Sequence, residues 1–340
     1  DLRRPPMLRN LTLRHRTVKY IRDFLDDRGF LEIETPILIK STPEGARDFL
    51  VPSRLQSGSF YALPQSPQQL KQLLMVSGIE KYFQIARCFR DEDLRADRQL
   101  EFTQLDLEMS FVDEEDILSL TEELYTGLIE SVTPEKKLTT PFQRLTYDES
   151  MSNYGTDKPD LRFGLKMTDV SDLATETEFR VFLSTVEHGG IIKGFVVPQQ
   201  ASYTSSVMRE LEDTAKEAGA GGLSHIRFRG SGPIKDMSEE EILYSAGLRM
   251  PSEWSHRLAE RMGANPGDSV LLMAGQAKLV NAWLSLMRSH VAQQLELADP
   301  DALAFAFITD FPLFDWNEEA KRWDSSHHPF TSLAEGQEEM

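Results

Sequence analysis

The chain contains a single cysteine, Cys88, among 340 residues. One thiol excludes an internal disulfide framework and a zinc site built from several cysteines. No stretch of about 18 consecutive apolar residues occurs, so the sequence predicts no membrane-spanning segment. The first residues also lack the apolar core of a signal peptide. No internal repeat is visible, and a composition of 40% hydrophobic and 27% charged residues favours a globular protein over a fibrous or disordered one.

Basic residues are scarce relative to acidic ones. There are 37 Lys and Arg against 55 Asp and Glu, which gives a formal net charge of −18. Because phosphate binding rests on Lys and Arg, this balance argues against DNA as a partner and against nonspecific RNA binding. Any nucleic-acid contact needs a local basic patch. One candidate lies in the first 28 residues, although its pattern alone favours a solvated helix face; it consists of Arg3, Arg4, Arg9, Arg14, Arg16, Lys19, Arg22 and Arg28.

Hydrophobic spacing predicts several helices and an early strand in the first half of the chain. The predicted helices cover residues 14–28, 66–76 and 113–132. Gly29 is expected to follow the first helix, and Asp113 is expected to cap the third. The segment FLEIETPIL alternates between apolar and acidic residues, which predicts a strand that ends near Pro36.

Two further segments, residues 81–90 and 101–109, alternate in polarity and predict an antiparallel hairpin. The connecting loop, DEDLRADRQLE, is longer than a tight hairpin requires, and such loops tend to be functional. A solvent-exposed polar face is the alternative, because antiparallel sheets often have one. The charged run at the mouth of the loop favours a site instead. One face of the hairpin carries Gln84, Arg90, Gln104, Asp106 and Glu108.

The length of the chain suggests two domains, although one large α/β domain is possible. The turn-rich segment YGTDKPDLRFG, residues 154–164, is a candidate boundary. Beyond it, strands and helices alternate and predict a small α+β domain. Within that domain, FRVFL at 179–183 and IIKGFVV at 191–197 are both interpreted as strands.

Six motifs occur in order along essentially the whole chain: FLEIETPIL, TPEGARD, PQSPQQLKQLLM, FRDEDLRADRQLEFTQLDLEM, YGTDKPDLRFG and SSHHPFTS. In this order they resemble the catalytic region of bacterial-type aspartyl-tRNA synthetases, a class II family that includes the mitochondrial enzymes. The resemblance implies an α+β fold, with a class II antiparallel-sheet catalytic core and an inserted α+β domain.

The same resemblance implies a division of the chain. Residues 1–153 correspond to the first part of the core with motifs 1 and 2, residues 154–300 to the inserted domain, and residues 301–340 to the return of the core before motif 3. The N-terminal anticodon-binding domain and motif 3 would then lie outside this chain. We therefore expect a fragment that is inactive by itself.

The resemblance also implies where ATP binds. Arg90, at the start of motif 2, corresponds to the residue that stabilises the charge developing on the α-phosphate during adenylate formation, as a fixed guanidinium can. It is the implied catalytic residue. Asp91, Glu92 and Gln99 are further implied ATP contacts, and Phe102 corresponds to the residue that stacks on adenine. ATP and Mg²⁺ are the implied cofactors, with the metal ligands expected beyond residue 340.

Aspartate recognition needs acceptors for an ammonium and a cation for the side-chain carboxylate. By resemblance, Lys71 faces the β-carboxylate, and Gln68 lies one helical turn away. A surface lysine is the alternative interpretation of Lys71. The adjacent His327 and His328 would lie near the substrate, and a weak metal site is the alternative for them. The residues matched to aspartate binding are Glu44, Ser66, Gln68, Lys71, Arg90, Asp106 and His327.

The loop of motif 2, with Arg95, Asp97 and Arg98, resembles the segment that reads the tRNA acceptor end. The implied partners are tRNA(Asp), L-aspartate and a second copy of the chain, joined through motif 1 in a homodimer. The implied location is the cytoplasm or the mitochondrial matrix.

The resemblance implies an aspartate–tRNA ligase, and two alternatives stay open. One is a non-catalytic synthetase-like protein that binds RNA or a partner. The other is an asparaginyl- or lysyl-tRNA synthetase relative, against which the inserted domain argues.

Overall fold

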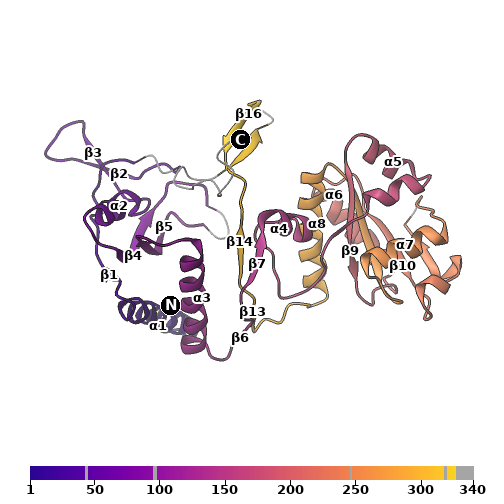
Figure 1. Cartoon of the computed structure of the whole chain (residues 1–340), viewed down its shortest axis with the longest axis horizontal. Coiled ribbons are helices and arrows are strands. Elements are labelled where there is room, and N and C mark those ends of the chain that lie inside the picture. Colours follow the sequence, from indigo (N-terminus) through magenta and orange to yellow (C-terminus); the bar gives the residue numbers. More distant parts are fainter. Residues whose placement is uncertain (43–44, 95–97, 246, 318–319, 327–340) are drawn as a thin grey trace. The chain divides into compact units, whose positions relative to one another are not determined.

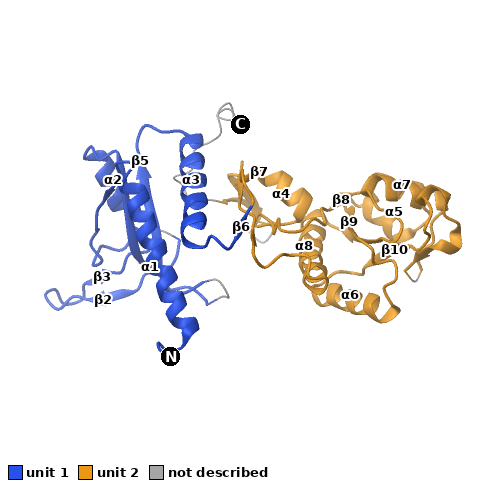
Figure 2. Ribbon diagram, turned by 90° about the horizontal axis from the view of Figure 1, so that it is seen from below, with its two compact units in different colours: residues 1–138 blue, residues 139–340 orange. Residues whose placement is uncertain are grey.

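The computed structural model describes the chain except for residues 43–44, 95–97, 246, 318–319 and 327–340 (Figure 1). The chain forms two compact units, Asp1–Leu138 and Thr139–Met340 (Figure 2). The described helices and strands combine in antiparallel and mixed sheets, which confirms the predicted α+β class. None of the described helices is long and apolar enough to cross a membrane.

The first unit is built on a three-stranded sheet of order β1-β4-β5. Strand β1 runs parallel to β4, and β4 runs antiparallel to β5, while β2 and β3 form a separate hairpin. The elements are α1 (Pro5–Asp26), β1 (Leu31–Glu32), β2 (Leu50–Pro52), β3 (Phe60–Ala62), α2 (Gln68–Val76), β4 (Lys81–Phe89), β5 (Glu101–Met109), α3 (Glu114–Val132) and β6 (Lys137–Leu138).

Helix α1 begins nine residues before the predicted start, with proline in its first turn. Proline is favoured there because its missing N–H has no partner in a helix anyway. The helix ends at Asp26, two residues before the predicted end, and Gly29 follows it with a φ of 77°, as expected for a glycine after a helix. Basic side chains in this helix and just beyond its ends form ion pairs with nearby acids, which agrees with a solvated face; the pairs are Arg4–Asp1, Lys19–Asp23, Arg22–Glu32 and Arg28–Glu123.

Strands β4 and β5 form the predicted antiparallel hairpin, which has two different faces. Phe83 lies opposite Leu107 and Ile85 opposite Leu105, and these residues pack with Leu25 of α1 and with α3 to form the core of the first unit. Because side chains alternate along a strand, the polar residues lie on the other face.

Helix α3 begins with the predicted cap. Asp113 accepts a hydrogen bond from the backbone N–H of Asp116, and the Asp116 carboxylate accepts one from the N–H of Asp113. This reciprocal capping box satisfies two backbone donors that the helix leaves open.

The second unit contains a five-stranded antiparallel sheet of order β11-β10-β12-β9-β8. Outside it, β7 pairs in parallel with β14, and β15 and β16 form a hairpin. The elements are β7 (Gln143–Thr146), α4 (Tyr147–Tyr154), β8 (Thr168–Asp169), α5 (Arg180–Glu187), β9 (Ile191–Val197), α6 (Ser205–Glu217), β10 (Ser224–Phe228), β11 (Ile242–Tyr244), α7 (Ser252–Met262), β12 (Ser269–Gly275), α8 (Ala277–Gln294), β13 (Ala302–Leu303), β14 (Ala306–Thr309), β15 (Phe314–Asn317) and β16 (Arg322–Ser325), with 3₁₀ turns at Ser171–Glu176, Ile234–Asp236 and Glu239–Glu241.

Helices cover both faces of the five-stranded sheet. Along β12, Val270 and Leu272 belong to a core cluster with α5 and α7, whereas Leu271 and Met273 belong to a second cluster with α6 and α8. The fully buried members of both clusters lie between residues 165 and 292. A sheet buried on both faces explains why β12 is an unbroken apolar run, SVLLMAG.

One predicted strand in this unit is wrong. FRVFL at 179–183 forms the start of helix α5, in which Phe182 is buried and Val181 is 55% exposed. A short apolar run does not distinguish a strand from a buried helical turn. Helical spacing prevails here because it places Phe182 and Val186 against the same core cluster. The strand predicted at 191–197 is confirmed as β9.

Candidate functional site

The polar face of β4 and β5 carries Asp106, one of the residues predicted for aspartate binding. In the register of the hairpin, Gln84 lies opposite Asp106 and Tyr82 lies opposite Glu108. Tyr82 is fully buried and Asp106 is 8% exposed. The alternative of a plain solvent-exposed face is therefore wrong, and this face forms a polar interior.

Helix α2 adds a buried cation to this face. Lys71 Nζ lies 2.8 Å from Asp106 Oδ1 and 3.1 Å from Glu108 Oε2. Burial alone would lower the pKa of Lys71, but the hydrogen bond and negative charge of Asp106, followed by those of Glu108, outweigh it and raise the pKa. Lys71 therefore stays charged, and the alternative of a surface lysine is wrong.

A hydrogen-bonded network continues from the carboxylates along β4. Gln84 Oε1 accepts hydrogen bonds from the hydroxyls of Tyr82 and Thr35, each at 2.9 Å. Burial, followed by the negative charge of Asp106, raises the pKa of Tyr82, so its phenol stays protonated. Within the described part of the chain, the buried Oδ2 of Asp106 has no hydrogen-bond partner.

The segment before α2 supplies two more predicted residues. Pro67 is the N-cap of α2, and Ser66 Oγ accepts a hydrogen bond from the backbone N–H of Gln68 at 3.0 Å. Gln68 and Lys71 are three residues apart in the first turn, so they lie on the same side of the helix. Ser66 and Gln68 are both partly buried. The structure therefore brings the start of α2 to the polar face of the hairpin.

The mouth of the hairpin brings Arg90 and Phe102 together. The backbone N–H of Arg90 donates to the carbonyl of Leu100 at 2.9 Å, which closes the base of the loop. The guanidinium carbon of Arg90 lies 5.1 Å from the centre of the Phe102 ring. Attraction between a guanidinium and an aromatic face stabilises this arrangement. Two residues predicted for ATP binding thus form one cation–aromatic pair.

The other residues predicted for the motif 2 loop lie nearby. Glu92 forms an ion pair of 2.9 Å with Arg98, and Asp91 lies 3.8 Å from the guanidinium of Arg47. Arg98 and Gln99 are both exposed. Four predicted residues lie outside the described part of the chain: Glu44, Arg95, Asp97 and His327.

Sequence reasoning missed Gln65, which is 1% exposed. Its amide nitrogen donates to the carbonyl of Ala46 at 2.9 Å and also bonds Asp48, while its amide oxygen accepts from the N–H of Ala46. Gln65 therefore ties the end of the TPEGARD segment to the segment that begins α2. The one available signal was its place beside Ser66 in PQSPQ. Glu108 was assigned to the polar face but was not predicted as a partner of Lys71.

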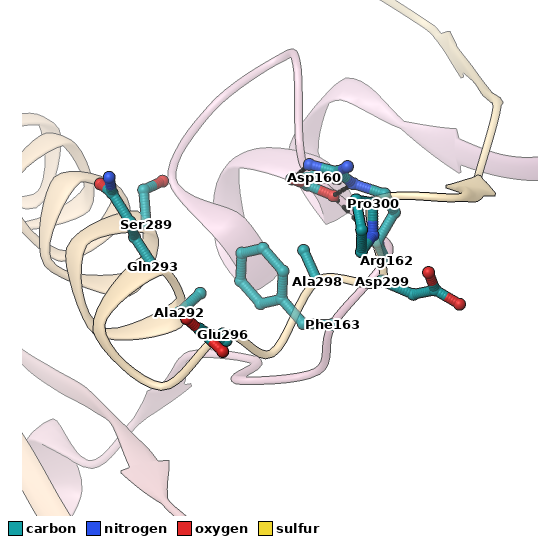
Figure 3. Close-up of a pocket in the computed structure, with 10 residues that line it drawn as sticks. All are labelled: Asp160, Arg162, Phe163, Ser289, Ala292, Gln293, Glu296, Ala298, Asp299 and Pro300. Carbon is teal, nitrogen blue, oxygen red and sulfur yellow. Dashed lines mark hydrogen bonds and ion pairs between the residues drawn. The ribbon is translucent and has the colours of Figure 1, made fainter.

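A separate hollow of about 840 Å³ lies in the second unit (Figure 3). Asp160 and Arg162 form an ion pair of 2.7 Å at one side, and Phe163 lies between them and helix α8. The buried Arg288 fixes this loop by donating to the carbonyls of Asp160, Phe163, Gly164 and Leu165. None of the residues predicted for aspartate or ATP lines this hollow, so we assign no part of the site to it.

Among the described residues, no group of three or more His, Cys, Asp and Glu side chains is placed to hold a metal ion. The polar face of the first unit and the mouth of its hairpin gather one ammonium, two carboxylates and a guanidinium. Such a set suits a small zwitterion that carries a further negative group.

A family model for class II tRNA synthetases (D, K and N) matches residues 1–340. The chain belongs to this family. It is 55% identical over 336 residues to an aspartate–tRNA(Asp/Asn) ligase of Dehalococcoides mccartyi. It is 50% identical over 332 residues to the protein of that name from Natranaerobius thermophilus, and 52% identical over 335 residues to the one from Rubrobacter xylanophilus.

These matches include 97–98% of the chain but 54–56% of each relative. The chain thus spans about half the length of the curated relatives it matches. Membership of the class II family confirms the fold that the six motifs implied.

Proposed function

We propose that the whole protein is an aspartate–tRNA ligase. It would activate L-aspartate with ATP to form aspartyl-adenylate and then transfer the aspartyl group to the 3′ end of tRNA. The observation that carries this proposal is the buried Lys71 ammonium on the polar face, held between Asp106 and Glu108. The names of the relatives support the same activity.

The family model spans aspartate, lysine and asparagine enzymes, so the amino acid has to be argued from the pocket. Lys71 supplies a charged partner for a substrate carboxylate, which a neutral asparagine amide matches less well. A lysine substrate would bring its ammonium close to that of Lys71, and like charges repel. The carboxylate of Asp106 suits the α-ammonium that all three amino acids share. Aspartate fits this combination best.

Arg90 is the proposed catalytic residue. In adenylate formation the aspartate α-carboxylate attacks the α-phosphorus of ATP, and pyrophosphate leaves. A guanidinium at the mouth of the hairpin stabilises the negative charge that grows on the α-phosphoryl oxygens. Phe102 offers its ring to the adenine base, and Glu92 and Gln99 lie on the same loop. The guanidinium of Arg90 lies over the Phe102 ring, so the proposed phosphate contact and the proposed adenine contact are adjacent.

Mg²⁺ is proposed as the partner of the ATP phosphates, where it would neutralise their charge. Among the described residues no group of three or more His, Cys, Asp and Glu side chains is placed to hold a metal ion, and we assign no residue to Mg²⁺.

The proposed RNA substrate is tRNA, read at its acceptor end by the motif 2 loop. Of that loop, Arg98 is exposed, and its pairing with Glu92 leaves it at the protein surface. Because the relatives carry the name aspartate–tRNA(Asp/Asn) ligase, we propose that tRNA(Asn) is a substrate as well as tRNA(Asp). Aminoacylation of each purified tRNA with radiolabelled aspartate tests this, and charging of tRNA(Asp) alone would contradict it.

A homodimer is also proposed, formed through α1 and the motif 1 segment that follows it. Both expose large apolar side chains, and such patches commonly mark interfaces. They are Met7, Leu8, Leu11, Leu13, Leu31, Ile37 and Leu38. Sedimentation velocity of the whole wild-type protein is expected to show a dimer. The double variant Leu8→Glu with Leu11→Glu is expected to sediment as a monomer. Leu55→Glu is the matched control, because Leu55 is exposed on the β2–β3 turn. A monomeric wild type would contradict the proposal.

ATP–pyrophosphate exchange with the whole protein tests the proposed function directly. Aspartate, asparagine and lysine are supplied separately, and aspartate alone is expected to support exchange. Exchange with asparagine or lysine instead would favour the other members of the family. No exchange with any amino acid, from a protein that binds tRNA, would favour the non-catalytic alternative. The location in cytoplasm or mitochondrial matrix stays a prediction.

A further inference from the structure

The candidate site balances one buried cation against two carboxylates from the same strand. Lys71 Nζ contacts Asp106 at 2.8 Å and Glu108 at 3.1 Å. The three groups together carry an excess of one negative charge while no substrate is present. The carboxylates differ in their surroundings, since the side chain of Asp106 is 9% exposed and that of Glu108 is 28% exposed.

An acidic substrate that reaches Lys71 brings a third carboxylate to a single ammonium. Like charges at such distances repel, and an uncompensated charge in a buried site is costly. One of the two resident carboxylates therefore has to leave Lys71 when the substrate carboxylate arrives. Asp106 is enclosed on the sheet face. Glu108 is longer and more exposed, so it can turn toward solvent and remain hydrated.

We propose that Glu108 is an internal competitor of the substrate. It pairs with Lys71 beside Asp106 until the side-chain carboxylate of aspartate displaces it. Glu108 thereby selects an acidic side chain over the amide of the same shape. This inference rests on the proposed function and adds a specificity-determining residue to it.

Selection follows from the strength of the two competing bonds to Lys71. A hydrogen bond between two charged groups is roughly twice as strong as one between neutral groups. Aspartate offers Lys71 the same chemistry as Glu108 and can replace it. Asparagine offers a neutral amide oxygen and leaves Glu108 in place. Specificity of this kind comes from a repulsive or competing element as well as from attraction.

The test is the variant Glu108→Gln in the whole protein, which keeps the size of the side chain and removes its charge. Isothermal titration calorimetry without ATP measures the Kd of aspartate and of asparagine separately. Aspartate is expected to bind about three- to tenfold more tightly than to wild type, as the loss of one charge-assisted competitor implies. The Kd of asparagine is expected to fall by a larger factor. The ratio of the asparagine Kd to the aspartate Kd is therefore smaller in the variant than in wild type.

Glu101→Gln is the matched control, because Glu101 lies on the same strand and forms an exposed pair with Arg87. It is expected to change neither Kd. If the glutamine variant fails to fold, Glu108→Ala is measured in its place. It is expected to lower both Kd values in the same way. An aspartate Kd that is unchanged or weaker in the folded variant overturns the proposal, and so does an asparagine Kd that stays at the wild-type value.

The wild-type titration separates this inference from the proposed function. A wild-type protein that binds no aspartate and shows no aspartate-dependent exchange overturns both. If the wild-type protein binds aspartate and shows aspartate-dependent exchange, but Glu108→Gln has the same two Kd values as wild type, only the role of Glu108 is overturned.

Discussion

At the scale of single residues, Arg90 is the side chain on which the proposed chemistry depends most. Its guanidinium lies at the mouth of the β4–β5 hairpin beside Phe102. We expect Arg90→Ala in the whole protein to lower the rate of ATP–pyrophosphate exchange by about 10²–10³-fold, because one preorganised charge contact to the transition state is lost. Unfolding should be nearly unaffected, since Arg90 is only partly buried. Exchange within threefold of wild type would contradict the assignment.

Lys71 combines a binding role with a structural one. From its apolar neighbours Leu70 and Leu74 alone, Lys71→Met would be expected to disturb packing little. The contacts with Asp106 and Glu108 change that expectation, since the variant leaves two carboxylates without their cation. We expect a loss of about 3 kcal/mol in the free energy of unfolding.

The same variant should raise the KM for aspartate far more than the KM for ATP. Denaturant unfolding and exchange assays that vary each substrate measure the two effects. A shift in the aspartate KM below about threefold, which is under 1 kcal/mol, would mean that Lys71 does not bind the substrate carboxylate.

His225 on β10 makes stability depend on pH. Burial, followed by the nearby charge of Arg227, lowers the pKa of His225 to about 4, below its ordinary value near 6.5. Between these two pKa values the unfolded chain binds more protons than the folded one, so stability falls as pH drops from 6.5 toward 4. We expect His225 to account for a loss of about 2 kcal/mol between pH 7 and 4.5.

Urea unfolding across this pH range checks the contribution of His225. In His225→Gln, the fall in the free energy of unfolding between pH 7 and 4.5 should be smaller than in wild type by about 2 kcal/mol. His188→Gln is the control, because His188 is exposed and should leave the profile unchanged. Equal slopes for wild type and His225→Gln would show that His225 keeps an ordinary pKa.

At the scale of elements, local sequence signals act through helix ends. The capping box of α3 joins Asp113 and Asp116. We expect Asp113→Ala to lower the free energy of unfolding by about 1 kcal/mol, because the first turn loses a hydrogen-bond acceptor for its backbone. Glu130→Ala, in the exposed last turn of the same helix, should change it by less than about 0.5 kcal/mol. Chemical denaturation of wild type, Asp113→Ala and Glu130→Ala measures these free energies of unfolding. Equal losses in the two variants would mean that the cap makes no specific contribution to stability.

At the scale of the whole molecule, the proposed inserted domain, residues 154–300, should fold on its own core. The fully buried residues of both clusters around the five-stranded sheet lie within that range. We expect replacement of about residues 155–300 by a short linker to leave a folded remainder, and the excised segment to fold when produced alone. Circular dichroism and limited proteolysis of both products measure this. A molten or aggregated remainder would show that the parts depend on one another.

Features that depend on local spacing were predictable from the order of residues alone. Alternation along 81–90 and 101–109 predicted the hairpin and the division of its faces, because a strand exposes every second residue to the same side. Helical stripes and an acidic cap predicted α2 and α3 for the same kind of reason. Six ordered motifs predicted the class II family, since motif order is a property of the chain alone.

Only the tertiary structure decided which distant residues meet. Lys71 and Asp106 are 35 positions apart, and the packing of α2 against the hairpin, which no periodicity describes, made them a buried ion pair. The contact of Gln65 with Ala46 likewise joins two loops that have no repeating pattern. At 179–183 the apolar run allowed either a strand or a helix, and burial of Phe182 against the sheet selected the helix. Local spacing fixes which face a side chain occupies, whereas packing between elements fixes what that face contacts.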